Sequence, residues 1–227
     1  MLLGARRVDR LESVARGARE SGAASASCHP LDVTSTASVH EFIRWARTLT
    51  KHLDVLINNA GGALGLDTVA KGHDQDWETM MQTNVLGVLR MVRATLPMLE
   101  STPCSSIINI GSTAGRVAYE GGAAYCAAKA GELQITRTLR LELNGTGIRV
   151  STIAPGAAQT EFSTVRFRGD TSRAAMVYEG MVPLTADDVA EIMVWVASRP
   201  AHVNIDEIVV KPTDQAAMHK VHRRQAK

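Results

Sequence analysis

The chain has 227 residues, a normal length for one α/β domain, and 45% of them are hydrophobic, which is enough for a sizeable core. Its 25 Lys and Arg against 23 Asp and Glu leave a formal net charge of +2, so the sequence lacks the basic balance typical of nucleic-acid binding. No apolar run reaches the roughly 18 residues that span a bilayer, and we expect no membrane segment. Three scattered cysteines (Cys28, Cys104 and Cys126) indicate neither a disulfide framework nor a metal site, and with no secretory signal we expect a cytoplasmic protein.

The first half of the chain alternates helical and strand patterns. Apolar residues at helical spacing predict a helix over 11–18, and a short strand is expected at 29–33. A second amphipathic helix is predicted over 39–49. It is followed by an apolar strand at 54–57 and by a longer helical stripe over 77–92.

The second half continues the same alternation. A strand is predicted at 106–110, followed by a long helix over 123–143 that an Asn-Gly pair stops. The next strand is expected at 148–153. A helix over 186–198 and a last strand at 207–210 complete the pattern.

Such alternation is typical of strand–helix units around a parallel sheet buried on both faces, so we expect a doubly wound α/β fold. We interpret residues 1–227 as one domain with a flexible, basic tail over 216–227. Ligands of these sheets bind at the carboxyl ends of the strands. Polar or glycine-rich stops follow three predicted strands, at Asn58–Gly61, Gly111-Ser112 and Pro155-Gly156. They predict one pocket at that edge of the sheet.

Tyr125 and Lys129 carry the strongest chemical signal, because residues four apart on a helix share one face. A free tyrosine has a pKa near ~10 and is a poor base at neutral pH. A lysine charge close by favours the phenolate and lowers that pKa. Ser112, at the end of a strand, offers a hydroxyl that can hydrogen-bond a substrate oxygen. The set predicts proton transfer coupled to hydride transfer with a nicotinamide.

Taken together, the motifs resemble the short-chain dehydrogenase/reductase family, whose members have a Rossmann-type fold. The resemblance runs from residue 1 to about 215 and rests on Asn59-Ala60-Gly61, Asn84, Ser112, Tyr125-x-x-x-Lys129 and Pro155-Gly156-x-x-x-Thr160. It implies that Tyr125 is the general acid/base and that Ser112 contacts the substrate oxygen. It also implies that Lys129 holds the nicotinamide ribose and lowers the pKa of Tyr125.

The resemblance further implies the rest of the cofactor site. Asn84 would hold a water in a proton relay through Lys129, and we favour this role over the alternative of a buried amide bonded to neighbouring backbone. Asp32 and Val33 would flank the adenine, and Thr160 would meet the nicotinamide carboxamide. The remaining cofactor contacts would come from the strand ends, at Asn59, Ala60, Gly61, Pro155 and Gly156.

Segments outside the shared motifs resemble the NADP-dependent serine and 3-hydroxy acid dehydrogenase subgroup, notably 58–65, 160–167 and 200–205. Within the second of these, Arg166 is a candidate clamp for a substrate carboxylate, with a solvated loop arginine as an equal alternative. Arg6 and Arg7 follow an expected strand end, where an arginine accommodates the 2′-phosphate of NADP and an acidic residue would favour NAD. Two solvated arginines opening a helix are the alternative interpretation.

One part of the family pattern is absent from the sequence. The family opens with a strand and a Thr-Gly-x-x-x-Gly-x-Gly turn that approaches the cofactor pyrophosphate. We expect the missing strand to leave a gap in the sheet between the strand near residue 3 and the strand near residue 56. A start codon placed too late, a truncated chain and a decayed gene are the explanations, and the intact later motifs favour the first.

The resulting functional hypothesis is hydride transfer between NADP(H) and a small 3-hydroxy acid or β-hydroxy amino acid, such as serine, allo-threonine or 3-hydroxypropionate. One alternative is a reductase of bulkier ketones or 3-oxoacyl thioesters. Another, of a different class, is a truncated non-catalytic protein that senses cofactor or is a relic. The resemblance also implies a homo-oligomer, most often a tetramer, built on the long helices that include 123–143.

Overall fold

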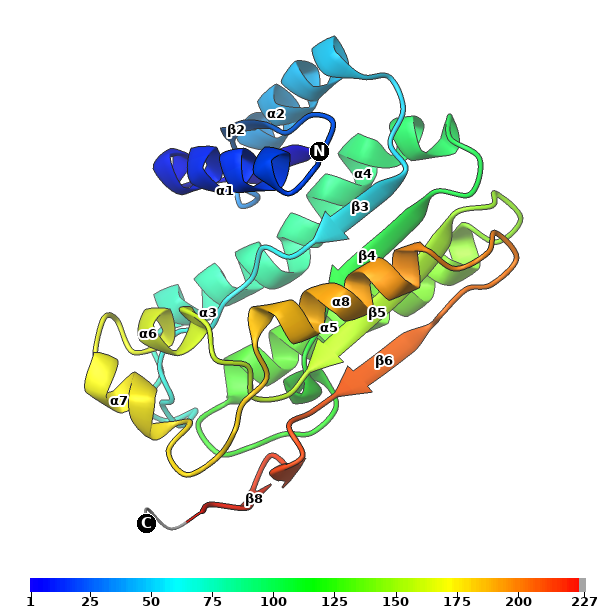
Figure 1. Ribbon diagram of the computed structural model, residues 1–227. Helices are drawn as coiled ribbons and strands as arrows, with labels where there is room; N and C mark the ends of the chain where they lie inside the picture. Colours follow the sequence, from blue (N-terminus) through cyan, green and yellow to red (C-terminus); the bar gives the residue numbers. More distant parts are fainter. Residues whose placement is uncertain (225–227) are drawn as a thin grey trace.

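The computed structural model describes residues 1–224 and arranges the predicted strands in parallel sheets (Figure 1). Four strands form one sheet in the order β3-β4-β5-β6, with bounds Val55–Asn58, Ser106–Ile110, Arg149–Pro155 and Glu207–Val210. A separate parallel pair consists of β1 (Leu2–Ala5) and β2 (Ser27–Pro30). The expected α/β fold with a parallel central sheet is confirmed.

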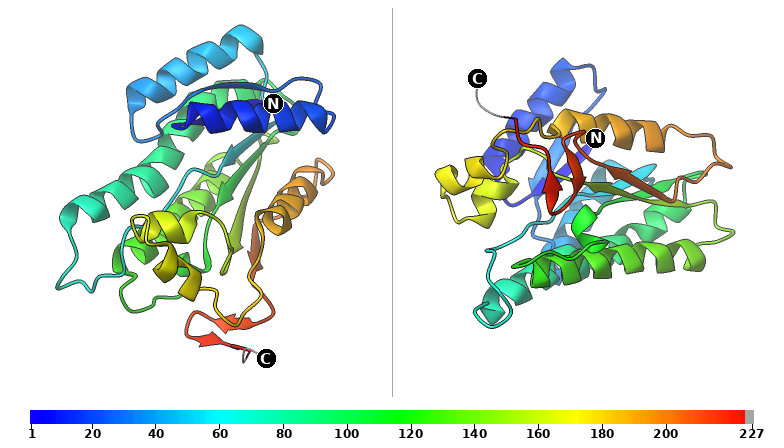
Figure 2. Two further views of the ribbon diagram at one scale, coloured as in Figure 1. Left: turned by 60° about the vertical axis from the view of Figure 1, so that its left-hand side comes forward. Right: turned by 90° about the horizontal axis from the view of Figure 1, so that it is seen from below.

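Helices cover both faces of the four-stranded sheet (Figure 2). α2, α4 and α5 pack on one face, and α8 packs on the other, where α1 covers the β1–β2 pair. The α-helices are α1 Val8–Glu20, α2 Thr36–Leu49, α3 Asp74–Met81, α4 Gly87–Glu100, α5 Ala123–Glu142, α6 Phe162–Arg166, α7 Thr171–Met176 and α8 Ala186–Ala197. A π-helical turn, Gln82–Leu86, joins α3 to α4, and a 3-10 turn, Thr113–Gly115, follows β4.

The strand β4 shows why the sheet is buried on both faces. Successive side chains of a strand point to opposite faces. Ile107 packs into the core under α2, α4 and α5, whereas Ile108 packs against α8. Both side chains are fully buried. The uninterrupted apolar run of β4 is therefore the pattern of a central parallel strand.

The central sheet is divided between β1 and β3, where the sequence leads us to expect a gap. β1 pairs only with β2 among the described strands, and β3 pairs only with β4. Figure 2 shows the β1–β2 pair, with α1 and α2, set apart from the edge of β3. Ile57 of β3 is 46% exposed, because no helix of the described chain covers that side of the strand end.

Three element boundaries differ from the sequence-based expectations. β2 covers Ser27–Pro30 instead of 29–33, because the Asp32 side chain accepts hydrogen bonds from the backbone N–H and hydroxyl of Thr34 and turns the chain. The helical stripe over 77–92 is interrupted by the π turn. α4 continues past the predicted end of that stripe at residue 92 and ends at Glu100.

The flexible tail expected over 216–227 contains short strands in its described part, and its flexibility stays a prediction. β7 (Gln215–Ala217) and β8 (Lys220–Val221) form a small antiparallel hairpin. Asp214 fixes it by accepting from the Val182 backbone at 2.9 Å and pairing with Arg224 at 3.2 Å. Residues 225–227 lie outside the described part of the chain. No helix of residues 1–224 is both long and apolar enough to cross a membrane.

Candidate active site

The helix α5 carries the two residues that the sequence analysis places at the centre of the chemistry. Tyr125 and Lys129 lie one turn apart on its buried face and are 8% and 6% exposed. The ring of Tyr125 packs against Phe162 of α6, with ring centres 5.5 Å apart. Ser112 follows β4, and its hydroxyl accepts a hydrogen bond from the Ala114 backbone at 3.1 Å. β4, α5 and α6 thus bring the expected catalytic groups together.

The pKa of Tyr125 is raised in this structure, and burial of the phenol is the largest cause. A hydrogen bond with the Ser112 side chain opposes this, as does the charge of Arg166. Lys129 is not among the largest causes of this pKa shift. Ser112 and Arg166 provide the opposing effect seen here, and the expected lowering of the Tyr125 pKa by Lys129 stays a prediction.

Lys129 has two polar partners, the Ile110 carbonyl and Glu132. Its Nζ donates to the backbone carbonyl of Ile110 at 2.7 Å and lies 3.6 Å from a carboxylate oxygen of Glu132. Burial lowers the pKa of Lys129, while the nearby Glu132 raises it. The ammonium is thus held at the carboxyl end of β4, where cofactors of parallel sheets bind.

Asn84 lies in the π turn and is almost fully buried. Its amide donates to the carbonyls of Gly62 and Met80 at 2.9 and 2.8 Å and accepts from the Gly62 N–H at 3.1 Å. The side chain is therefore bonded to backbone, which is the contact that the alternative interpretation describes. A π turn inside a helix is frequent at functional sites. A relay role for Asn84 stays a proposal.

Arg166 lies directly beside Tyr125. Its Nε donates to the Gly65 carbonyl and one terminal nitrogen donates to the Tyr119 hydroxyl, both at 2.9 Å. Its guanidinium carbon is 5.5 Å from the ring centre of Tyr119 and 5.8 Å from that of Tyr125. A pocket opens at this point, lined by Leu64, Gly65, Asp67, His73, Asp76, Trp77, Met80, Gly121, Ala124, Tyr125 and Arg166. Arg166 is therefore not the solvated loop arginine of the alternative interpretation.

Comparison with known proteins identifies the family. The family model described as short chain dehydrogenase matches residues 1–170. The chain belongs to the short-chain dehydrogenase family. It is 45% identical over 195 residues to an NADP-dependent 3-hydroxy acid dehydrogenase of Salmonella typhi, covering 85% of this chain and 79% of the relative. A protein of the same name from Schizosaccharomyces pombe is 40% identical over 226 residues, covering 100% of this chain and 87% of the relative.

The solved structures agree with this assignment. A closed form of serine dehydrogenase complexed with NADP⁺ superimposes with a TM-score of 0.89 at 39% identity, covering 99% of this chain and 89% of that one. Serine dehydrogenase from Escherichia coli gives a TM-score of 0.79 at 35% identity, with 95% and 88% covered. The expectation of an oxidoreductase of the short-chain dehydrogenase family is confirmed.

The strand ends place the expected cofactor residues of this short-chain dehydrogenase along one edge. Asn59, Ala60 and Gly61 are exposed after β3. Pro155 ends β5, and its carbonyl accepts from the Thr113 hydroxyl. Gly156 packs tightly against the Gln215 side chain, and Thr160 is exposed, with its hydroxyl accepting from the Phe162 N–H. These positions leave the nicotinamide end of a dinucleotide site open beside Tyr125 and Lys129.

The residues expected at the adenosine end of the cofactor site differ in their contacts. Asp32 follows β2, and its pKa is lowered by hydrogen bonds from Thr34 and by the nearby charge of Arg6. Val33 is buried, and its side chain packs at Gly87 of α4. Arg7 does not lie free, since it pairs with Glu161 at 2.7 Å. Arg6 is therefore the arginine that stays close to Asp32.

The fit of a dinucleotide is thus better at one end than at the other. At the nicotinamide end, the absence of a side chain at Gly61 lets its backbone lie close to Asn84 and Lys129, because an added Cβ would lie 2.8 Å from Asn84 Oδ1 and 3.5 Å from Lys129 Nζ. At the pyrophosphate end, the strand and the Thr-Gly-x-x-x-Gly-x-Gly turn that the family pattern places between β1 and β3 are absent from residues 1–224. The residues present fit the ribose and nicotinamide of a bound cofactor.

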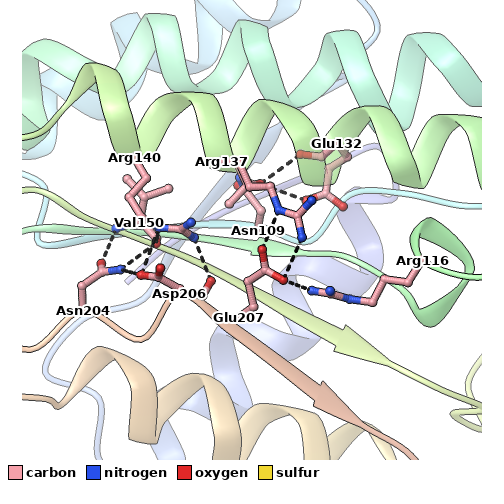
Figure 3. A network of polar contacts seen from close by, with 10 residues as sticks. Asn109, Arg116, Glu132, Arg137, Arg140, Val150, Asn204, Asp206 and Glu207 are labelled. Carbon is pink, nitrogen blue, oxygen red and sulfur yellow. Dashed lines mark hydrogen bonds and ion pairs between the residues drawn. The ribbon is translucent and has the colours of Figure 1, made fainter.

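A polar network that the sequence analysis missed lies behind Ser112 (Figure 3). Glu207 of β6 pairs with Arg116, in the loop after Ser112, and with Arg137 of α5 at 2.7 Å. These arginines hold the pKa of Glu207 at about 2, well below its usual value. Nearby, Arg140 pairs with Asp206 at 3.1 Å. The network ties the Ser112 loop and α5 to the same strand, but no motif in the sequence signals it.

A second polar set missed at the sequence level lies under α5. The Asn58 amide donates to Asn109, and the Asn109 amide donates to the Thr136 hydroxyl, both at 2.8 Å. Thr136 in turn donates to Glu132. The signals available were an asparagine within an apolar strand and a carboxylate one turn after Lys129. Residues 1–224 contain no cluster of His, Cys, Asp and Glu suited to a metal ion.

Proposed function

We propose that this short-chain dehydrogenase transfers a hydride between NADP(H) and a small 3-hydroxy acid or β-hydroxy amino acid. Substrates of the serine, allo-threonine and 3-hydroxypropionate type would be interconverted with the corresponding 3-oxo compounds. The observation that carries the proposal is the position of Arg166 over the Tyr125 ring, inside the pocket. An arginine there suits a carboxylate held next to the reacting hydroxyl.

The contacts of Arg166 leave one nitrogen of its guanidinium group available to a substrate. Nε and one terminal nitrogen are bonded to Gly65 and Tyr119, which fixes the plane of the guanidinium. The second terminal nitrogen has no protein partner within residues 1–224 and can donate to a carboxylate oxygen. Trp77 and Met80 line the pocket and restrict its size. A small acid suits this arrangement better than a bulky ketone or an acyl thioester.

The chemistry follows from Tyr125 and Ser112. In the oxidation direction Tyr125 accepts the proton of the substrate hydroxyl, and the hydride leaves the carbinol carbon, so the product is a 3-oxo acid. In the reduction direction the neutral phenol donates that proton, and the raised pKa of Tyr125 favours this state. Ser112 hydrogen-bonds the reacting oxygen in both directions. A bound nicotinamide supplies or accepts the hydride.

NADP is the cofactor that the residues and the relatives favour. Arg6 and Asp32 lie together after β1 and β2, so an exposed guanidinium is available for a 2′-phosphate. The 3-hydroxy acid dehydrogenases at 45% and 40% identity carry NADP in their names. We propose that Arg6, and not the paired Arg7, discriminates NADP from NAD.

The test is a substrate panel with an Arg166 variant. We expect turnover of 3-hydroxypropionate with NADP⁺. Arg166→Ala should raise its KM about 30-fold or more, because a charge-assisted hydrogen bond in a desolvated site is lost. A neutral secondary alcohol should show no such change. Arg173→Ala, which removes an arginine stacked on Phe167 of the loop ahead of α7, is the matched control.

Two outcomes would contradict the proposal. Wild-type preference for acyl thioesters or bulky ketones over 3-hydroxypropionate would favour the bulkier-substrate alternative. NADPH binding without turnover of any panel member would favour the non-catalytic cofactor sensor. In either case Tyr125→Phe identifies the chemistry: under the proposal this variant binds NADPH normally and loses turnover.

We also propose a homo-oligomer, with a tetramer as the assembly that the family resemblance implies. An apolar groove runs between α4 and α5 and supports a helix-to-helix interface with a second copy. It is lined by Val85, Leu89, Gly131, Gln134, Ile135, Thr138, Leu139 and Glu142. Leu89 lies in the groove and is tested below.

A further inference from the structure

Glu132 is a buried carboxylate that the proposed chemistry does not use. Its side chain is 1% exposed, and carboxylates are rarely buried so completely unless they are paired. One oxygen accepts from the Thr136 hydroxyl at 3.3 Å. The other has no hydrogen-bond partner within residues 1–224 and lies 3.6 Å from Lys129 Nζ. Within the described part of the chain, its charged neighbour is therefore the lysine expected to hold the cofactor ribose.

The surroundings of Glu132 form a polar row across the sheet. Asn58, Asn109 and Thr152 are register partners on β3, β4 and β5, so their side chains point to the same face, beneath α5. All three are buried. Figure 3 shows Glu132 and Asn109 together under the helix. Glu132 is joined to this row through the Thr136 hydroxyl, and its other oxygen faces Lys129.

The row also fixes where the carboxylate can lie. Asn109 is bonded to Asn58 on one side and to Thr136 on the other, and Thr136 is bonded to Glu132. An added Cβ at Gly111 would come within 3.5 Å of the free oxygen of Glu132, so little space is left there. Neutral groups hold the carboxylate in one position, and Lys129 is the cation that pairs with it.

Among residues 1–224, Glu132 is the anion that acts on Lys129. On α5 itself, Tyr125 is the other titratable neighbour, and Glu132 raises its pKa. From the elements packed against this turn, Tyr119 and Arg166 act on Tyr125 and not on Lys129. Glu207 is engaged by Arg116 and Arg137. Burial alone would favour a neutral Lys129, and the carboxylate opposes it.

We propose that Glu132 is a positioning residue that keeps Lys129 charged and directed at the Ile110 carbonyl, beneath Gly61. The pairing of Glu132 with Lys129 is inferred from the contacts alone. Its consequence, tighter binding of the cofactor ribose by Lys129, rests on the proposed function. Glu132 touches neither substrate nor cofactor in this role.

The pairing is tested first without cofactor, by thermal melting of wild type and Glu132→Gln from about pH 6 to about pH 10. The amide keeps the shape and removes the charge. We expect a melting temperature lower by about 6 °C or more near pH 7, because a buried ammonium has lost its partner. Since burial depresses the folded-state pKa of Lys129, the deficit should shrink as pH rises and the amine loses its proton. Glu191→Gln, an exposed carboxylate of α8, is the matched control and should not change the melt.

A second variant keeps the test valid if Glu132→Gln folds poorly. The double variant Glu132→Gln with Lys129→Met removes both charges and should recover most of the lost melting temperature. For the consequence, NADPH titration of Glu132→Gln should show a Kd about tenfold higher than wild type at pH 8, and a smaller difference at pH 6.

Two results would overturn the inference. One is a deficit in Glu132→Gln that is the same at every pH and is not recovered by removing Lys129, since that marks lost packing only. The other is wild-type NADPH affinity in Glu132→Gln across the pH range. Failure of the proposed function looks different: wild type itself would not oxidise 3-hydroxy acids, while the cofactor-free melts would still report the Glu132–Lys129 pair.

Discussion

Gly61 is the position where the structure makes its sharpest quantitative prediction. An added Cβ would lie 2.8 Å from Asn84 Oδ1, closer than real Cβ atoms approach, and 3.5 Å from Lys129 Nζ. The Asn84 amide cannot retreat freely because three backbone hydrogen bonds hold it. We therefore expect Gly61→Ala to lower the free energy of unfolding by about 1–3 kcal/mol, the cost of overpacking together with one or two weakened hydrogen bonds.

The neighbouring glycine provides the control. At Gly62 an added Cβ meets nothing within 4 Å, and the backbone is not in the left-handed region. Gly62→Ala should change the free energy of unfolding by less than about 0.5 kcal/mol, or stabilise slightly by restricting the unfolded chain. Urea unfolding followed by circular dichroism measures both variants. Equal effects of the two substitutions would refute the packing of Gly61 against Asn84 and Lys129.

Two further predictions concern the network behind Ser112 and the groove between α4 and α5. Glu207→Gln should destabilise the protein by about 1–2 kcal/mol at pH 7, after allowance for partial exposure of its partners. Because the folded-state pKa of Glu207 is depressed to about 2, the difference in stability from wild type should vanish as pH falls from about 4.5 towards that value. A pH-independent difference between the unfolding curves would count against the ion pairs. Leu89→Glu should shift the assembly towards monomers in light scattering, with the far-ultraviolet spectrum unchanged, and an unchanged oligomer would exclude the groove as an interface.

Most of the fold could be predicted because periodicity reports which faces are buried. β4 and α5 match their predicted ranges within one residue. The π turn could not be predicted, since it differs from an α-helix only in the register of a few backbone hydrogen bonds. The end of β2 was misplaced because the Asp32–Thr34 turn overrides an apolar run.

The sequence predicts which residues meet at the site better than it predicts how their charged groups pair. Spacing places Tyr125 and Lys129 on one face, but it does not say where each polar tip points. In the structure Lys129 is drawn to the Ile110 carbonyl and Glu132. Arg7 pairs with Glu161, 154 residues away along the chain, and no local pattern reveals such a contact. Glutamate is a residue type usually found at the surface, so only the packed structure shows that Glu132 is buried.

The open side of β3 has a consequence for handling the protein. Its sequence is Val-Leu-Ile-Asn, without a charge or a proline, and its outer row of N–H and C=O groups has no strand partner among residues 1–224. Natural sheets protect such rows with charged side chains, proline or a covering element, because an unprotected one templates strand addition between molecules. We therefore expect self-association that rises with protein concentration and warming, and an introduced lysine at Ile57 should suppress it. Purification at low concentration and low temperature is the practical corollary.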